Sequence, residues 1–367
     1  MTAPSVAPAP QAIPVHTPSA DYEIHIGSGS AARLGALLDA VKAPARRFLV
    51  SSPPIWKLHG QTFEGLTSEA PILIPDGERH KRVATVGRIY DALVRAAADR
   101  ATTIVAVGGG VVGDTAGFAA ATFLRGVPVV QVPTTLLAQV DSAIGGKVGV
   151  NHPLGKNLIG AFHQPLVVAI DPELLSTLPR REFRAGLYEV VKYGMIASRS
   201  LFDRLVSGLP AIFKREPALL ADVIGESCRI KAAVVSADER ESGPRRALNF
   251  GHTIGHALEA LTQYKRFRHG EAVAYGMLAA CELAVARGAL DPSARDALRE
   301  LITRMGPLPA VTDLSAAEAV EAAGRDKKIV GGRLHFVLPT AIGTTLTVTD
   351  VTGEELARAT EAIGLKR

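Results

Sequence analysis

The sequence predicts an α/β protein in which a domain built on a mostly parallel sheet precedes a mainly α-helical domain. In the first half, short apolar runs alternate with helical stretches, which is typical of parallel strands joined by helices. From Glu182 to about Arg304, apolar residues are spaced for the buried faces of one helix after another. The character of the chain changes near Asp171-Pro172. We therefore expect a domain boundary shortly after these residues.

Local composition places the individual elements. Residues 1–20 are rich in Ala and Pro, without a basic start or an apolar segment, so we expect a disordered tail and no signal peptide. The strand candidates are YEIHI, RRFLVS, PILIP, TTIVAV, VPVVQV and LVVAI. Near the C-terminus, LHFVLPT and TTLTVTD predict a hairpin, and EELARATEAIG predicts a closing helix. The predicted parts are a tail (1–20), a Rossmann-like nucleotide-binding domain (21–178) and a mainly helical metal-binding domain (179–367), with the active site in the cleft between the two domains.

The composition of the chain limits the kinds of molecule that we expect it to bind. The net charge is +5, but the cations are scattered, aromatic residues are few and no recognised nucleic-acid motif is present, so we expect no nucleic-acid partner. Excess cations also suit an enzyme with anionic substrates. No apolar run is long enough to span a bilayer, so we expect no membrane association. Two cysteines, Cys228 and Cys281, provide no disulfide framework, which favours a reducing, cytoplasmic location.

A glycine-rich turn follows the run TTIVAV and precedes the helical AGFAAATF; it reads Gly108-Gly109-Gly110-Val111-Val112-Gly113-Asp114. In this context, glycines let a phosphate approach the backbone at a helix N-terminus. No acidic residue lies about twenty positions further on to hold a ribose, so this is not the standard first unit of a dinucleotide-binding fold. Taken alone, the turn is also explained by close packing.

Nearby loops add polar residues that suit a nucleotide or a phosphate. After Asp76, Glu78 and Lys81 share one side of a predicted helix start, where they either bind ribose and phosphate or form an exposed ion pair. Thr134 and Thr135 follow a strand and either donate to a cofactor or cap the next helix. Further cations that can reach an anion are Arg125, Lys147 and Lys156.

The second half offers a carboxylate and imidazoles, the ligand types that Zn²⁺ prefers. His252 and His256 are four residues apart on a predicted helix and share a face, so the simplest motif interpretation makes both of them ligands. The Thr-Ile-Gly between them lacks the glutamate of the metalloprotease motif H-E-x-x-H. Glu189 lies with Lys192 on an apolar helix, where a carboxylate must be paired, metal-bound or near the surface. His269 in RHGEAVAYGM is a further candidate.

Three donors precede His252 and suit a substrate carboxylate. They are Lys231, Arg245 and Asn249, of which Arg245 offers a bidentate guanidinium. For any one of the polar residues above, a structural ion pair or a hydrogen-bonded core side chain is the simpler explanation. The case for a site depends on their number.

Together these motifs resemble those of the 3-dehydroquinate synthase family, the shikimate-pathway branch of the sugar phosphate cyclases. The resemblance runs from about Tyr22 to the C-terminus. Its motifs are GGGVVGD, VPTTLLAQVDSAIGGKVGVNHPLGKNLIGAFHQP, LPRREFRAGLYEVVKYG, RIKAAVVSADERESGPRRALNFGHTIGHALEA, RHGEAVAYGM and DKK. Long motifs in this order are far more specific than a glycine signature alone.

The resemblance implies a role for each candidate residue. Zn²⁺ (or Co²⁺) would be held by Glu189, His252 and His269, with His256 near the substrate phosphate instead of on the metal. The implied catalytic residues are Asp141, Lys147, Lys192, Asn249 and His256. The residues implied around the substrate are Arg125, Lys147, Asn157, Lys192, Lys231, Arg245, Asn249, His256, and Lys327 or Lys328. Those implied around NAD⁺ are Asp76, Glu78, Lys81, Gly110, Val111, Val112, Gly113, Asp114, Thr134, Thr135, Lys147, Lys156 and Thr177.

The implied activity is conversion of 3-deoxy-D-arabino-heptulosonate 7-phosphate to 3-dehydroquinate and phosphate by a homodimeric carbon–oxygen lyase. Oxidation by NAD⁺ acidifies the proton next to the new ketone, phosphate leaves, the hydride returns, and an intramolecular aldol reaction closes the ring. Zinc holds the hydroxyls and polarises the ketone. One segment departs from the family pattern: Ser51-Ser52-Pro53-Pro54 stands where acidic or amide residues usually lie near the adenosine ribose, which concerns cofactor affinity.

Three other interpretations remain open. Another sugar phosphate cyclase, such as an inosose or valiolone synthase, has less need of the carboxylate-binding set Lys231, Arg245 and Asn249. A metal-dependent polyol dehydrogenase forms NADH and has little need of so many phosphate-binding cations. A catalytically dead binding protein is expected to have lost a metal ligand, yet Glu189, His252 and His269 are all present.

Overall fold

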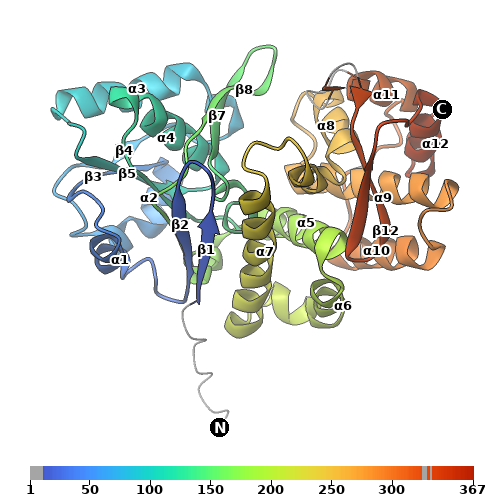
Figure 1. The fold of residues 1–367 in the computed structure, drawn as a ribbon, viewed down its shortest axis with the longest axis horizontal. Helices are drawn as coiled ribbons and strands as arrows, with labels where there is room; N and C mark the ends of the chain where they lie inside the picture. Colours follow the sequence, from blue (N-terminus) through green and yellow to red (C-terminus); the bar gives the residue numbers. More distant parts are fainter. Residues whose placement is uncertain (1–10, 325–328, 331–332) are drawn as a thin grey trace, which may run out of the picture. The chain divides into compact units, whose positions relative to one another are not determined.

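The structure is a computed structural model that describes residues 11–324, 329–330 and 333–367. The chain divides into two compact units (Figure 1). The first unit consists of the chain up to Pro179 together with Arg215–Arg240, and the second consists of Arg180–Lys214 and Glu241–Arg367.

A seven-stranded sheet forms the centre of the first unit, in the order β1-β2-β9-β6-β5-β3-β4. Its strands are β1 (Gln11–His16), β2 (Asp21–Ile26), β3 (Arg46–Ser51), β4 (Ile72–Leu73), β5 (Thr102–Gly108), β6 (Val129–Pro133) and β9 (Val167–Ile170). β1 pairs antiparallel with β2, and every other neighbouring pair is parallel. The prediction of a mostly parallel sheet is confirmed, and all six predicted strands are present.

Both faces of the sheet are buried. Successive residues of a strand point to opposite faces, so each strand contributes side chains to both of them. The helices of the first unit are α1 (Leu34–Ala40), α2 (Pro53–His59), α3 (Val83–Arg95), α4 (Gly110–Thr122) and α7 (Pro217–Ala237). On β3, Phe48 and Val50 join an apolar cluster that includes residues of α3 and α4. Leu49, between them, joins a second cluster that includes residues of α1. The alternation explains why these strands read as continuous apolar runs.

The chain changes direction across the sheet between β3 and β5. From β3 it continues outward to β4, whereas from β5 it continues to β6 on the other side. Ligands of such sheets bind beyond the carboxyl ends of the strands at a reversal of this kind. The glycine-rich turn lies there, because Gly108 ends β5 and Gly109 is the N-cap of α4. The backbone N–H groups at the start of α4 are thereby placed at the expected ligand position.

Two segments of the first unit differ from the sequence prediction. Residues 11–16 form strand β1 in place of part of the predicted tail. Ile13 and Val15 are buried on it, but two apolar residues between prolines are too short a periodic signal to predict a strand. The antiparallel hairpin of β7 (Lys147–His152) and β8 (Gly155–Phe162) was also not predicted, because glycines interrupt its apolar alternation.

Helix α7 belongs to the first unit, although the predicted boundary assigns everything after residue 178 to the helical domain. It packs on β1 and on η4, a short π-helical segment at Ala138–Ser142. Its buried face includes Val223, Ile224 and Cys228. The second unit is therefore made of two separate chain segments.

The second unit is mainly helical, as predicted. Its helices are α5 (Arg180–Ala197), α6 (Arg199–Phe213), α8 (His252–Leu261), α9 (His269–Ala286), α10 (Pro292–Met305), α11 (Ala316–Gly324) and α12 (Gly353–Ala362), with the 3-10 segment η6 (Pro244–Asn249). Its strands are β10 (Ile329–Val330), β11 (Arg333–Leu334), β12 (Phe336–Ala341) and β13 (Thr344–Val348). The predicted hairpin corresponds to β12–β13 and the closing helix to α12. Within the described residues, no helix combines the length and the apolarity needed to cross a membrane.

Helices α5, α8 and α9 approach one another closely at glycines. A Cβ atom on Gly276 of α9 would lie 1.8 Å from the carbonyl oxygen of Gly251, the residue before α8. A Cβ atom on Gly270, at the start of α9, would lie 1.9 Å from the carbonyl oxygen of Ala185 in α5. Only glycine permits these backbone contacts. They hold the start of α9 against α5 and α9 itself against the start of α8.

Replacing Gly276 by alanine should lower the free energy of unfolding by about 1–3 kcal/mol, because the added methyl group overlaps the Gly251 carbonyl and forces α8 and α9 apart. Urea unfolding followed by circular dichroism measures the change. Gly324→Ala in α11 is the matched control, since its added methyl group meets nothing within 4 Å. Equal stability of the two variants would contradict the packing argument.

Candidate metal centre and nucleotide site

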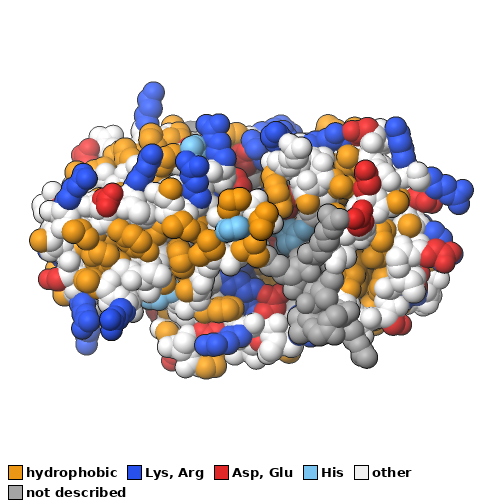
Figure 2. All heavy atoms as spheres, turned by 90° about the horizontal axis from the view of Figure 1, so that it is seen from above, with side chains coloured by type: hydrophobic (Ala, Val, Ile, Leu, Met, Phe, Trp, Pro, Cys, Tyr) orange, Lys and Arg blue, Asp and Glu red, His pale blue; other side chains and the backbone are white. Residues whose placement is uncertain are grey.

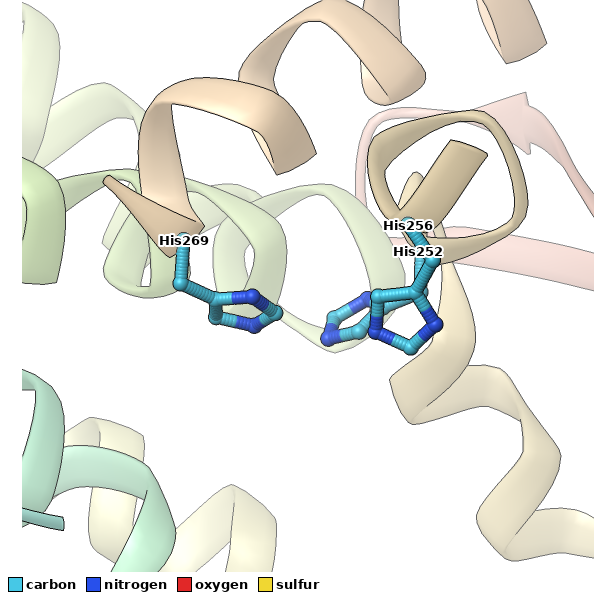
Figure 3. Close-up of side chains that lie close together, drawn as sticks. All are labelled: His252, His256 and His269. Atoms are coloured by element: carbon cyan, nitrogen blue, oxygen red, sulfur yellow. The ribbon is translucent and has the colours of Figure 1, made fainter. Parts of the chain in front are cut away.

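Glu189, His252 and His269 lie close together in the second unit, on α5 and at the first residues of α8 and α9. Glu189 Oε1 is 3.6 Å from His269 Nε2 and 3.9 Å from His252 Nε2. The ring of His256, one turn after His252 on α8, lies beside the other two rings (Figure 3), with centroids 5.4 Å from His252 and 5.9 Å from His269. Three helices thus bring four candidate ligands to one place.

The burial of Glu189 fits a bound cation. Its side chain is fully buried, and Oε2 forms an ion pair with Lys192. Oε1 has no hydrogen-bond partner among the residues that the structure describes. A buried carboxylate oxygen without a partner is costly, by several kcal/mol. A divalent cation between Oε1 and the two Nε2 atoms would remove that cost, so the residues present fit a metal.

Hydrogen bonds at the other ring nitrogens orient two of the imidazoles. His252 Nδ1 lies 3.2 Å from the carbonyl oxygen of Phe250, and His269 Nδ1 lies 3.3 Å from Oε2 of Glu259. Both oxygens can only accept, because a carbonyl and an ionised carboxylate carry no proton. The proton of each neutral ring therefore belongs on Nδ1. The lone pair on Nε2 is left toward Glu189, in the arrangement that metal-binding histidines usually show.

His256 leaves a second donor set open. One nitrogen from each of His252, His256 and His269 lies within 4.8 Å of the others. The described residues therefore offer either the three histidines or Glu189 with His252 and His269. Burial favours the set with Glu189, because a cation bound elsewhere would leave Oε1 unsatisfied.

A buried ion cluster anchors the start of α9. Glu271 is fully buried and accepts hydrogen bonds from Arg181 (2.7 and 2.8 Å) and Arg184 (3.2 Å) on α5. It also accepts from the backbone N–H of Arg268 (2.8 Å). Burial disfavours the charged carboxylate, but the bonds from Arg181, Arg268 and Arg184 outweigh it and lower the pKa of Glu271. His269, two residues earlier, is thereby fixed relative to α5.

The predicted carboxylate-binding residues are distributed over both units. In the second unit, Arg245 is buried and Asn249 donates a hydrogen bond to the side chain of Glu241. In the first unit, Lys231 of α7 is buried and donates to the carboxylate and the backbone carbonyl of Asp141. Lys231 and Asp141, ninety residues apart in sequence, thus form one charged pair.

In the first unit, Lys81 is hydrogen-bonded to two other predicted site residues. Its ammonium group donates to Oδ2 of Asp114 and to Oδ1 of Asn157, both at 2.5 Å. Glu78 accepts from Asn151 at 2.7 Å. Burial disfavours the charged form of Lys81, but attraction to Asp114 and Glu78 outweighs it and raises the pKa of Lys81. A fixed positive charge therefore lies beside the start of α4.

Three predicted cofactor residues also have structural roles. Thr135 caps the following turn, because its hydroxyl accepts from the N–H of Ala138 at 3.2 Å. Thr177 is hydrogen-bonded to His59 at 2.9 Å. The side chain of Val112 lies in the apolar core, so only its backbone is available to a ligand. Thr134 is buried at the end of β6.

The remaining predicted residues fall into three groups. Gly110, Val111 and Gly113 lie in the first turn of α4. The side chains of Asp76, Arg125 and Lys147 are exposed, and Lys156 is half-buried on β8. Lys327 and Lys328 lie outside the described residues. In the divergent segment, Ser51 donates to the carbonyl of Val107 at 2.8 Å, and Ser52 is fully buried.

Sequence reasoning missed several polar residues around the site. They are Glu259, Glu271, Glu241, Asn151 and His59. Glu259 and Glu271 stand among apolar helical residues, as Glu189 does, which was a usable signal. The partners of Glu241, Asn151 and His59 depend on loop positions that have no sequence signature.

Two family models match the chain: 3-dehydroquinate synthase N-terminal over residues 71–185 and 3-dehydroquinate synthase C-terminal over residues 186–329. A curated protein from Synechococcus sp. named 3-dehydroquinate synthase is 48% identical over 363 residues, covering 96% of this chain and 98% of its own length. The chain belongs to the 3-dehydroquinate synthase family.

Solved structures similar to this family member include two other cyclizing synthases. 2-epi-5-epi-valiolone synthase from Streptomyces hygroscopicus, with NAD⁺ and Zn²⁺ bound, is 29% identical with a TM-score of 0.85, covering 93% of this chain and 96% of its own. 2-deoxy-scyllo-inosose synthase, complexed with carbaglucose-6-phosphate, NAD⁺ and Co²⁺, is 25% identical with a TM-score of 0.81. The match covers 96% of this chain and 99% of that synthase. The identity to the 3-dehydroquinate synthase from Synechococcus sp. is much higher than to either.

Replacing Glu271 by alanine should lower the free energy of unfolding by roughly 3 kcal/mol, because it leaves the partly buried Arg184 without its carboxylate partner. Denaturant unfolding of the full chain measures the loss. Glu282→Ala on the same helix is the control. Glu282 is paired with Arg295 and Arg299, which are more exposed, so its replacement should lower the free energy of unfolding by less. Equal losses for the two variants would show that the buried cluster has no special role.

Proposed function

We propose that the chain converts 3-deoxy-D-arabino-heptulosonate 7-phosphate to 3-dehydroquinate and phosphate, a step of the shikimate pathway. The observation that carries the proposal is the fully buried Glu189 carboxylate, whose Oε1 faces the Nε2 atoms of His252 and His269. Such a centre suits chemistry in which a hydroxyl group is oxidised and a neighbouring group is eliminated. Membership of the 3-dehydroquinate synthase family supports the same reaction.

Glu189, His252 and His269 would hold Zn²⁺ or Co²⁺, and NAD⁺ would occupy the start of α4. When bound, NAD⁺ would accept and return a hydride, and the metal would supply a Lewis acid that stabilises negative charge on the substrate oxygen. Lys81 and Asp114 would fix the phosphate and ribose end of the cofactor. The remaining proposed cofactor contacts are Asp76, Glu78, Gly110, Val111, Val112, Gly113, Thr134, Thr135, Lys147, Lys156 and Thr177.

The two ends of the substrate carry different anions, and different residues would bind them. Lys231, Arg245 and Asn249 would bind the carboxylate, which distinguishes this substrate from that of an inosose-forming cyclase. The phosphate would be bound by Arg125, Lys147, Asn157, His256, and Lys327 or Lys328. A phosphate held by several cations can itself take the neighbouring proton as it leaves. The chain then needs only to position it.

Lys192 and Asp141 would act at the reacting carbon atoms. The buried Lys192 ammonium forms an ion pair with Glu189, so its charge lies beside the proposed metal position. Asp141 is paired with Lys231, and its carboxylate would accept a hydrogen bond from a substrate hydroxyl. Together they would hold the hydroxyls in one orientation through oxidation, elimination and return of the hydride.

We also propose that the enzyme is a cytoplasmic homodimer. Two buried free cysteines suit a reducing compartment. Burial raises the pKa of Cys228 to about 12, which keeps this thiol protonated and unreactive.

The proposed activity predicts phosphate release from the heptulosonate phosphate in the presence of Zn²⁺ and NAD⁺, without net formation of NADH. A phosphate assay run in parallel with absorbance at the NADH band measures both quantities. His252→Ala should lower the rate by at least about a thousandfold, because the metal contributes several kcal/mol to transition-state stabilisation.

Other outcomes of this assay separate the alternatives. NADH accumulation without phosphate release would indicate a polyol dehydrogenase. Turnover of a sugar phosphate that lacks a carboxylate, with none of the heptulosonate phosphate, would indicate another cyclase. Normal turnover by metal-free His252→Ala would contradict the proposed centre.

Lys81→Met should weaken NAD⁺ binding about tenfold or more, because it removes a charged hydrogen-bond donor next to the start of α4. Calorimetric titration of the full chain with NAD⁺ measures the affinity. Lys57→Met, at an exposed lysine of α2, is the matched control and should bind NAD⁺ normally. Unchanged affinity in Lys81→Met would remove Lys81 from the proposed cofactor site.

A further inference from the structure

Glu259 of α8 is a second buried carboxylate beside the proposed metal site. The residue is 3% exposed and follows Ala257 and Leu258, which are both buried. Its Oε2 lies 3.3 Å from Nδ1 of His269, the first residue of α9. The contact therefore joins two helices at one of the proposed metal ligands.

The two metal-facing imidazoles are oriented by different kinds of group. His252 is hydrogen-bonded through Nδ1 to the backbone carbonyl of Phe250, two residues before it. His269 has a side chain from another helix in the corresponding place. Substitution can remove the second partner but not the first. The orientation of His269 thus depends on the identity of residue 259.

A carboxylate at this position has two effects on His269. Because the ionised group only accepts hydrogen bonds, it places the proton of the neutral ring on Nδ1 and leaves the lone pair on Nε2, 3.6 Å from Glu189 Oε1. Its negative charge also makes the imidazole a better electron donor to a cation. Without it, the half-buried ring would lose this constraint on its orientation and its tautomer.

We propose that Glu259 is a positioning residue for the metal centre, which fixes the tautomer and the ring orientation of His269. The proposal rests on the metal site described under Proposed function and extends it by one residue. Glu259 acts through His269 and has no contact with the metal itself.

The test measures the affinity of the full-length, metal-stripped chain for Zn²⁺ by competition with a chromogenic chelator. Glu259→Leu removes the acceptor at similar size and should weaken binding about 10–100-fold. Glu259→Gln keeps the shape and one accepting oxygen, so it should lose clearly less. Glu282→Gln on α9 is the matched control: its carboxylate is paired with Arg295 and Arg299, and its affinity should equal that of the unmodified chain.

A double-substitution cycle separates positioning from a general loss of structure. If Glu259 acts through His269, adding Glu259→Leu to His269→Ala should leave the remaining affinity unchanged. A further loss of the same size in that background would overturn the proposal. So would wild-type affinity in a folded Glu259→Leu variant.

The Co²⁺-loaded chain gives a second readout that does not depend on Glu259→Leu being folded. The visible absorption of bound Co²⁺ reports its ligand geometry, and it should shift in Glu259→Gln while remaining unchanged in Glu282→Gln. An unshifted spectrum in Glu259→Gln together with unchanged Zn²⁺ affinity would overturn the proposal.

The outcome for Glu259 can be told apart from that of the metal site itself. If His269 is not a ligand, His269→Ala alone keeps full Zn²⁺ affinity, and the proposed centre fails. If His269→Ala loses affinity while Glu259→Leu does not, the centre stands and only the role of Glu259 fails.

Discussion

The burial of one carboxylate constrains the rest of the second unit. Glu189 has no exposed surface, and only one of its oxygens faces a cation, Lys192. The other oxygen faces two imidazole nitrogens. An unsatisfied buried charge of this kind is normally selected against unless a ligand completes it. We therefore interpret α5, α8 and α9 as a frame that holds the Glu189 carboxylate in position to bind a cation.

The frame is built by close backbone packing and by buried charge. Gly276 and Gly270 let α9 touch the start of α8 and the middle of α5 at backbone distance, which side chains would prevent. The hydrogen bonds from Arg181 and Arg184 of α5 to Glu271 then restrict how α9 can rotate or slide relative to α5. Ligands on three helices are thus placed with little freedom, as a catalytic centre requires. In the first unit, the proposed ligand position is set in a different way. The chain changes direction across the sheet between β3 and β5, and the N-terminus of α4 lies at that point.

Much of the fold could be predicted from the sequence, because its signals are local. Strands β3 and β5 are buried on both faces and read as apolar runs, and the amphipathic helices of the second unit show their own periodicity. Strand β1 and helix α7 were misjudged, because the place of each is decided by packing with distant segments.

The site was harder to predict than the fold. Helical spacing puts His252 and His256 on one face but cannot say which of them meets Glu189, and family resemblance supplied that choice. Glu259 reaches His269 only through the packing of α8 on α9. The pairing of Lys231 with Asp141 likewise depends on tertiary structure, since ninety residues separate them.

The most direct test of this account is the zinc K-edge X-ray absorption spectrum of the zinc-loaded chain. Scattering from imidazole rings counts the histidine ligands, and nitrogen or oxygen ligands are expected at about 2.0–2.1 Å. The account predicts two imidazoles, with the remaining ligands oxygen atoms and one of them from Glu189. Three imidazoles, together with a spectrum that Glu189→Ala leaves unchanged, would show that His256 and not Glu189 binds the metal, and would contradict the claim that the buried carboxylate organises the centre.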